Sequence, residues 1–304
     1  MSFMKNIFVW AVLSVIPFTL QAKEYRIGVS MALFEDPFMT VLRNAIRDEM
    51  SRENVKGQIE DAKSDVSTQL QQVQEFIGQG VDAIILNPVD TEAVKPVIAQ
   101  AKSAGIPLIF VNRRPQIPLD DKMVYVGSDS LISGKLQMEA LAKIMNGKGN
   151  VAILMGDLAN EATRERTKGV ESVIAKYPDM KVVQKQSAKF SRNEAVNVVS
   201  NWMGAGDEID AIVANNDEMA IGALIALGKN KNVLVAGIDG TRDALRQVEA
   251  GKMVVSVFQD ARGQGEGAVK AAVKLLNGEP VEKQVMIPYQ LITKDNYKNF
   301  VGKS

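Results

Sequence analysis

The sequence predicts an α/β protein of two similar, doubly wound parallel-sheet lobes joined by a multi-strand hinge. First, a continuous apolar strand at 209–214 gives way to Asn216 and Asp217 at the start of a helix. Because the strand lacks polar alternation, we expect both of its faces to be buried under helices. Second, residues 81–90 repeat the order of apolar strand, Asn and acid. Third, strands and helices alternate along the chain and the alternation restarts near residue 150, which predicts the second lobe.

Residues 1–22 have the pattern of a secretory signal peptide. Lys5 precedes an apolar core at 7–20, and Ala22 is a suitable cleavage residue. The core is short and is followed closely by polar sequence, which favours a cleaved signal over the alternative, a membrane anchor. We therefore expect the protein to be exported, with cleavage near Ala22.

Composition narrows the classes of function. The chain contains no Cys and no His, and its 36 Lys plus Arg residues balance 36 Asp plus Glu. Without Cys and His there is no thiolate nucleophile, no imidazole general base and no common zinc site, which argues against catalysis. The balanced charge, without a basic run, argues against nucleic acid as a partner. We expect no metal, because the common zinc ligands Cys and His are absent. We also expect no cofactor, because the glycines at 263, 265 and 267 do not follow a strand as a dinucleotide motif requires.

The first half of the chain alternates apolar runs with amphipathic stretches. The apolar runs predict strands at 25–30, 58–60, 83–86, 107–111 and 123–126. Helical spacing of apolar residues predicts helices at 38–50, 69–77 and 91–104. Pro37 suits the first turn of the first helix, where its missing N–H is not needed. This βαβ order implies parallel strands and right-handed crossovers, and the polar segment 127–130 is the predicted first crossing between lobes.

The second half repeats this order. It predicts strands at 150–155, 181–184, 211–214, 233–238 and 254–258. It predicts helices at 160–176, 192–203, 218–227 and 265–276. The tail at 285–293 is strand-like with Pro288 inside, and it is too short for a third domain, so we expect it to return to the first lobe. The predicted lobes are 23–127 plus 260–289 and 128–259 plus 290–304.

Seven short segments at the ends of these elements carry a family resemblance. They are 36–39 (DPFM), 111–113 (VNR), 164–166 (RER), 190–192 (FSR), 216–220 (NDEMA), 237–240 (GIDG) and 258–259 (FQ). In this order and spacing they resemble the type I periplasmic binding proteins, the sugar receptors of ABC importers, and most of all the ribose-binding group. The resemblance extends from residue 24 to about residue 293.

The resemblance implies a sugar or polyol ligand held between the lobes. Phe38 and Phe190 would flank the ring, and carboxylate, amide and guanidinium groups would bind its hydroxyls. The implied ligand-binding residues are Asp36, Phe38, Asn112, Arg113, Arg164, Phe190, Asn216, Asp239 and Gln259. The resemblance also implies a periplasmic monomer that docks on an ABC permease in the inner membrane, with a chemoreceptor as a further partner.

Three departures from the ribose pattern leave the ligand open. Asn112 stands where ribose binders have aspartate, Met39 stands where they have a second aromatic residue, and a longer loop at 31–36 supplies Phe34. Ribose, a hexose and a cyclic polyol such as myo-inositol all remain candidates.

Physical chemistry supports the implied set and also leaves alternatives. Planar groups with paired polar atoms suit neighbouring hydroxyls, and aromatic rings suit the C–H faces of a sugar. Yet Asn216 or Asp217 could simply cap a helix, and Phe190 could belong to the core. The many carboxylates leave a secreted carbohydrate-active hydrolase as the alternative function, and a ligand-presenting partner of a chemoreceptor as another.

Overall fold

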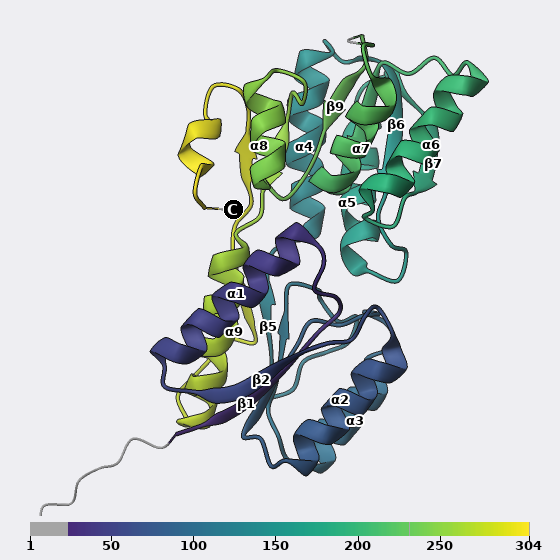
Figure 1. The fold of residues 1–304 in the computed structure, drawn as a ribbon. Helices are drawn as coiled ribbons and strands as arrows, with labels where there is room; N and C mark the ends of the chain where they lie inside the picture. Colours follow the sequence, from purple (N-terminus) through teal and green to yellow (C-terminus); the bar gives the residue numbers. More distant parts are fainter. Residues whose placement is uncertain (1–23, 231, 304) are drawn as a thin grey trace, which may run out of the picture.

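The molecule consists of two α/β lobes stacked one above the other (Figure 1). This computed structural model describes residues 24–230 and 232–303. The predicted signal peptide at 1–22 lies outside the described residues. Among the helices of the described chain, none combines the length and the apolar character that a membrane crossing requires.

The first lobe is organised around a six-stranded sheet with the order β11-β5-β4-β3-β1-β2, in which every neighbouring pair runs parallel. Its strands are β1 (Arg26–Met31), β2 (Lys56–Asp61), β3 (Ala83–Leu86), β4 (Leu108–Val111), β5 (Met123–Gly127) and β11 (Gln284–Met286). Two helical layers cover it: α1 (Pro37–Arg52) and α9 (Ala261–Leu276) on one face, α2 (Val66–Gly78) and α3 (Lys95–Ser103) on the other. The tail strand β11 completes one edge of this sheet.

The second lobe contains a four-stranded parallel sheet with the order β7-β6-β8-β9. Its strands are β6 (Lys148–Met155), β7 (Asp179–Ser187), β8 (Ala211–Ala214) and β9 (Leu234–Ala236). Next to β9 runs β10 (Ser256–Phe258), and β12 (Gln290–Ile292) pairs with β10 in antiparallel fashion. Every residue of β8 is buried, which confirms the prediction from its lack of alternation.

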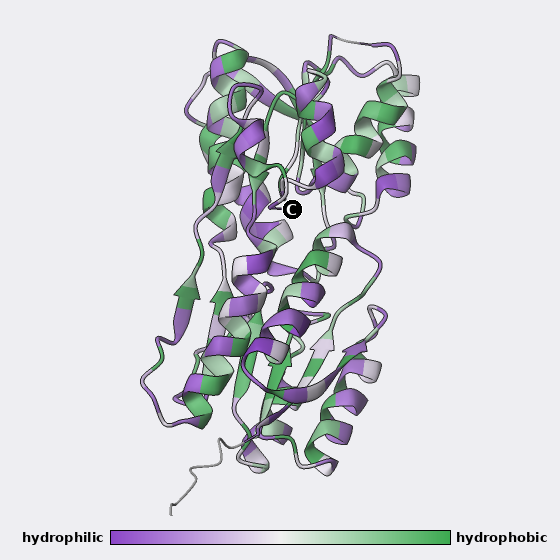
Figure 2. Cartoon of the chain, turned by 60° about the vertical axis from the view of Figure 1, so that its left-hand side comes forward, coloured by the Kyte–Doolittle hydropathy of each residue, from purple (hydrophilic) through white to green (hydrophobic). Residues whose placement is uncertain are grey.

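Helices also cover both faces of the second sheet. On one face pack α4 (Ser130–Ile144) and α5 (Glu161–Ile174). On the other pack α6 (Arg192–Ala205), α7 (Asp217–Leu227) and α8 (Arg242–Glu249), with a 3₁₀ turn at Tyr297–Phe300. Hydrophobic residues follow the central strands, and the helices carry hydrophobic and hydrophilic stretches in alternation, as expected for amphipathic helices on a buried sheet (Figure 2).

The chain passes between the lobes three times within the described residues. The passages lead from β5 into α4, from β10 into α9 and from β11 into β12. These passages confirm the predicted fold class of two doubly wound lobes joined by a hinge of several segments. The residue boundaries of the lobes, 23–127 plus 260–289 and 128–259 plus 290–304, stay a prediction.

A buried asparagine plays the same part in each lobe. Asn87, directly after β3, accepts a hydrogen bond from the Ala32 backbone N–H at 3.2 Å. Asn215, directly after β8, accepts one from the Gly156 N–H at 3.1 Å. In both lobes the side chain ties the carboxyl end of a central strand to the loop that leaves the neighbouring strand. The two strand-ends that look alike in the sequence are therefore built alike.

Two predicted elements differ from the structure, and two helices were not predicted. The predicted helix at 91–104 begins only at Lys95, with Pro96 in its first turn, because residues 91–94 form turns that reach the other lobe. Helices α4 and α8 were not expected from the apolar spacing. The single strand expected at 285–293 is two strands in different lobes, since Pro288 lacks the N–H that a continuous ladder needs.

Close backbone packing between α4 and α5 yields a stability prediction. A Cβ on Gly134 would lie 2.1 Å from the Arg166 carbonyl oxygen, and one on Gly169 would lie 2.5 Å from the Leu131 carbonyl oxygen. We expect Gly134→Ala to force the two helices apart and to lower the free energy of unfolding by about 1–3 kcal/mol. Urea denaturation followed by circular dichroism measures this change.

Gly204 in α6 offers a matched control. A Cβ there meets no heavy atom of the described chain within 4 Å. Gly204→Ala should therefore stabilise the protein by about 0.5–1 kcal/mol, the usual gain in a helix interior. Equal effects of the two substitutions would contradict the close packing of α4 on α5.

Candidate functional site

A cavity of about 460 Å³ lies between the lobes at the carboxyl ends of both sheets. Carboxyl ends of parallel strands are where open α/β sheets bind ligands, and the volume lies within the usual range for small-molecule sites. Eight of the nine residues singled out from the sequence line it. They are Asp36, Phe38, Asn112, Arg113, Phe190, Asn216, Asp239 and Gln259.

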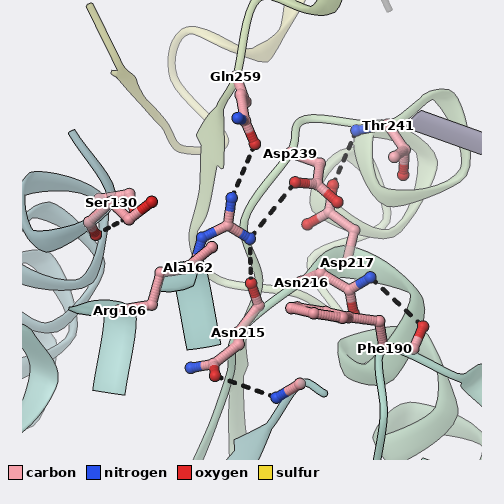
Figure 3. Close-up of polar contacts among 12 residues, drawn as sticks. Ser130, Ala162, Arg166, Phe190, Asn215, Asn216, Asp217, Asp239, Thr241 and Gln259 are labelled. Carbon is pink, nitrogen blue, oxygen red and sulfur yellow. Dashed lines mark hydrogen bonds and ion pairs between the residues drawn. The ribbon is translucent and has the colours of Figure 1, made fainter. Parts of the chain in front are cut away.

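The guanidinium of Arg166 lies at the centre of the polar groups in this cavity (Figure 3). Nη2 donates to Gln259 Oε1 at 2.7 Å and to the Tyr289 hydroxyl at 3.2 Å. Nη1 donates to the Asn215 carbonyl and lies 3.7 Å from Asp239 Oδ1. Burial alone would lower the pKa of Arg166, but Tyr289 and Asp239 together raise it. Arg166 is therefore a fixed positive charge that holds groups from several segments in one geometry.

Arg164, the arginine chosen from the sequence, does not line the cavity. Its guanidinium lies at the boundary between the lobes, where Nη1 donates to the Leu158 carbonyl at 2.8 Å and Nη2 lies 3.1 Å from Glu92 Oε1. Two residues change the direction of a side chain on a helix by about half a turn, so only one of this pair can face inward.

Helix periodicity is the signal that distinguishes the two arginines. Arg166 precedes the buried Val170 by four positions and Val173 by seven, so it shares their face of α5. Arg164 is out of phase with both. Combining the predicted apolar face with the arginine pair would have selected Arg166.

Asp239 is the carboxylate that faces Arg166. It is 6% exposed and has a φ of 128°, in the region that favours glycine. Burial raises its pKa well above the ordinary value, and Arg166 opposes this effect. Asp217 holds the turn at residues 239–241 in place. Its Oδ2 accepts the Thr241 N–H at 2.7 Å and its Oδ1 accepts the Ser256 hydroxyl at 2.7 Å.

The first lobe contributes Asp36 and Arg113. Asp36 caps α1 by accepting the Met39 N–H at 2.9 Å. Burial raises its pKa, an effect opposed by that hydrogen bond and by Arg113 and increased by Glu218 across the cavity. Arg113 donates from Nη1 to the carbonyls of Pro88 and Val89, at 3.0 and 3.2 Å. Burial lowers its pKa to about 10, and its buried Nε has no hydrogen-bond partner within the described chain.

Asn112 lines the cavity, although its amide is partly committed to the protein. Nδ2 donates to Gln264 Oε1 at 3.0 Å, and Oδ1 accepts from Asn87 Nδ2 at 3.4 Å. Its φ of 65° is left-handed, a conformation that asparagine tolerates better than most residues. These bonds tie Asn112, which directly follows β4, to α9 beside the hinge.

Asn216 and Phe190 form the wall contributed by the second lobe. Asn216 is the N-cap of α7 through its Oδ1, which accepts the Met219 N–H at 3.0 Å, so the capping alternative holds for Asn216 and not for Asp217. Its Nδ2 donates to the Phe190 carbonyl at 3.4 Å. The Phe190 ring lies beside Asn216 and packs against Gly156, where any side chain would collide with it (Figure 3).

Sequence reasoning also missed other lining residues. These include Ser130, Asp157, Asn160, Lys189 and Glu218. Glu218 is bound by Arg192 through two hydrogen bonds, at 2.9 and 2.8 Å. Among the described residues, no group of three or more Asp or Glu side chains is arranged to hold a metal ion. The cavity thus offers paired donors and acceptors with aromatic walls, the chemistry that suits a ligand rich in hydroxyls.

Comparison with known families identifies the chain. Residues 27–280 match the model of the periplasmic binding protein domain. The chain belongs to the periplasmic binding protein family. Membership implies a periplasmic location and a protein that binds solutes without transforming them, so the hydrolase alternative is not favoured.

Similar proteins bind sugars and related compounds. A protein of Rhizobium meliloti named as a rhizopine-binding protein is 46% identical over 287 residues, which cover 91% of this chain and 93% of that protein. A ribose import binding protein of Bacillus subtilis is 34% identical over 273 residues, covering 90% and 88%. The crystal structure of an ABC transporter solute-binding protein from Bacillus halodurans, with bound myo-inositol, superposes with a TM-score of 0.89 at 43% identity, covering 94% of this chain and 100% of that one. These relatives confirm the resemblance drawn from the sequence.

Proposed function

We propose that this protein captures a cyclic polyol, with myo-inositol as the first candidate, between its lobes and delivers it to an ABC importer in the inner membrane. The observation that carries the proposal is the interlobe cavity, in which the buried Arg113 and Arg166 and several carboxylates, among them Asp36 and Asp239, accompany amides and aromatic rings. A ring that bears a hydroxyl on every carbon presents neighbouring hydroxyls all around its edge. Each pair of hydroxyls can bind one planar carboxylate, amide or guanidinium.

The proposed contacts come from both lobes. Arg113 and Asp36 would bind one edge of the ring, while Arg166, Asp239 and Gln259 would bind another. Asn112 and Asn216 would supply further amide contacts, and Phe38 and Phe190 would cover the apolar faces. Arg166 takes the role that the sequence assigned to Arg164.

Two considerations favour a cyclic polyol over ribose. A relative with 43% identity and closely similar structure has myo-inositol bound. In addition, Asn112, Met39 and Phe34 depart from the ribose pattern, and Asn112 and Met39 line the cavity on the side formed by the first lobe. Ribose and hexoses are the comparison ligands in the test below.

Several finer predictions belong to the same proposal. They are cleavage of a signal peptide near Ala22, action as a monomer, and presentation of the loaded protein to a chemoreceptor. Mass determination of the exported protein, light scattering in solution and pull-down from membranes test them in turn.

A thermal-shift panel tests the ligand class. A ligand that binds only the folded state stabilises it by about 2.7 kcal/mol at a concentration of 100 Kd. We expect the largest increase in Tm with myo-inositol, smaller increases with hexoses and ribose, and none with a charged sugar phosphate as the control. An increase with ribose alone would contradict the preference for a cyclic polyol, and no increase with any member would contradict the proposed function.

A further inference from the structure

Contacts outside the cavity also join the two lobes, and they centre on Thr91. This residue lies in the connection between β3 and α3 of the first lobe and is fully buried. Its backbone N–H and its hydroxyl both donate to the Ala159 carbonyl of the second lobe, each at 3.1 Å. Its Oγ1 accepts the Glu161 N–H at 3.1 Å and a weaker contact from Arg164 Nη2 at 3.4 Å. The hydroxyl therefore uses its donor and both acceptor positions across the lobe boundary.

The Glu161 N–H is the first backbone donor of α5 and has no acceptor within its own helix. Thr91 supplies that acceptor from the opposite lobe. Asn160 caps the same helix from within the second lobe, accepting the Ala162 N–H at 3.0 Å. The N-terminus of α5 is thus completed only when the first lobe lies against it, and α5 is the helix that carries Arg166.

An ion pair continues this contact toward the surface. Arg164 Nη2 lies 3.1 Å from Glu92 Oε1, and the two side chains are 36% and 66% exposed. Thr91, Glu92 and Arg164 are not among the residues that line the cavity in the described chain. Thr91 is itself held in place within the first lobe, because its carbonyl accepts the Gln116 N–H at 3.1 Å.

We propose that Thr91 and Glu92, together with Ala159, Glu161 and Arg164, form a latch that positions α5 and sets how firmly the lobes close, and thereby the affinity for the ligand. This inference rests on the proposed function of ligand capture, and it adds Thr91, Glu92 and Arg164, which act without lining the cavity. The latch must break when the lobes separate, since it joins them at a point where no chain segment crosses. Its contribution is the same whichever ligand occupies the cavity, so it changes affinity without changing selectivity.

Three substitutions distinguish an effect on the latch from a general loss of stability. Thr91→Val keeps the shape of the side chain and removes the hydroxyl, whereas Thr91→Ser keeps the hydroxyl. Arg164→Gln removes the exposed ion pair with Glu92 and the guanidinium hydrogen bonds to Thr91 and the Leu158 carbonyl, and it keeps the test decisive if Thr91→Val does not fold. Glu171→Gln is the matched control, because the exposed pair of Glu171 with Lys185, at 2.7 Å, lies within the second lobe.

Two measurements are needed. The chain has no Cys, so Gln71→Cys in α2 and Asn197→Cys in α6, both exposed, allow spin labels to report the distance between the lobes. Stopped-flow displacement of myo-inositol gives the dissociation rate. In Thr91→Val we expect ligand-free protein to shift to longer distances and dissociation to accelerate about tenfold, because the Glu161 N–H loses its acceptor and the Ala159 carbonyl loses one of its two donors. In Arg164→Gln we expect about a twofold to fivefold acceleration.

Thr91→Ser and Glu171→Gln should match the wild type in both measurements, and the ratio of affinities for myo-inositol and ribose should stay constant in all variants. The latch proposal is overturned if Thr91→Val keeps the wild-type distances and dissociation rate. It is also overturned if Thr91→Ser changes these two quantities as much as Thr91→Val does. If no polyol binds, the proposed function fails, and the distances in ligand-free protein still decide whether the latch exists.

Discussion

Replacing Arg166 with alanine is expected to weaken binding of the polyol by about 100-fold to 1,000-fold. The substitution leaves the carboxylate of Asp239 buried without its counter-charge, an arrangement that costs about 3–5 kcal/mol. It also frees Gln259 and the Asn215 carbonyl, which the guanidinium holds in place. Isothermal titration calorimetry with myo-inositol measures the loss, and circular dichroism establishes that the variant is folded.

Arg164 provides the natural control, since it lies two residues away on the same helix. Arg164→Ala should weaken binding only a few-fold, because its pair with Glu92 is exposed to solvent. Arg166→Lys should fall nearer to Arg166→Ala than to the wild type, since an ammonium cannot reproduce the planar fork that spans Gln259, Tyr289 and Asn215. A larger loss in Arg164→Ala than in Arg166→Ala would contradict the central role of Arg166.

The stability of the ligand-free protein is expected to fall as the pH rises toward 7, with Glu161 as a main cause. This side chain is 4% exposed, and burial raises its pKa to about 7 even though Arg166, Arg114 and the Ser130 hydroxyl oppose that effect. The folded protein therefore keeps a proton that the unfolded chain releases above its ordinary pKa of 4.5. The stability due to this proton is fully present below about pH 4.5 and is lost as the pH rises to about 7.

Glu161→Gln isolates this effect. At pH 8 the variant should be more stable than the wild type by up to about 3 kcal/mol, and at pH 4 the two should be alike. Urea denaturation at several pH values measures the difference. Glu139→Gln removes a carboxylate from an exposed pair with Lys176, which lies just after the end of α5, and should show little dependence on pH. A constant difference between Glu161→Gln and the wild type across the pH range would contradict a buried, protonated Glu161.

Local pattern was sufficient for most of the fold. A strand such as 211–214 is apolar at every position because both faces are covered, and the structure buries every residue of it. Helix α4 was not predicted because its inward face begins with Ser133, Gly134 and Gln137, and its buried apolar positions Met138, Leu141 and Ala142 lie only in its second half. Thr91 was assigned to a helix because local spacing carries no information about a partner in the other lobe.

The candidate site also contains residues that the sequence predicts and residues that it does not. Residues at strand ends, such as Asn216, Asp239 and Gln259, could be predicted because topology brings the carboxyl ends of parallel strands together. The choice between Arg164 and Arg166 depended on the rotation of α5, which the apolar positions Val170 and Val173 specify and the arginine pair alone does not. The double role of Asn216, as a helix cap and as part of the cavity wall, is visible only in the structure.

A crystal structure of the protein with myo-inositol tests the central claim most directly. The account predicts one molecule of the polyol in the interlobe cavity, with its hydroxyls bound by Arg113, Arg166, Asp239 and Gln259 and with Phe38 and Phe190 against its faces. A polyol bound elsewhere on the molecule, or held in the cavity without contact to Arg166 and Asp239, would contradict it.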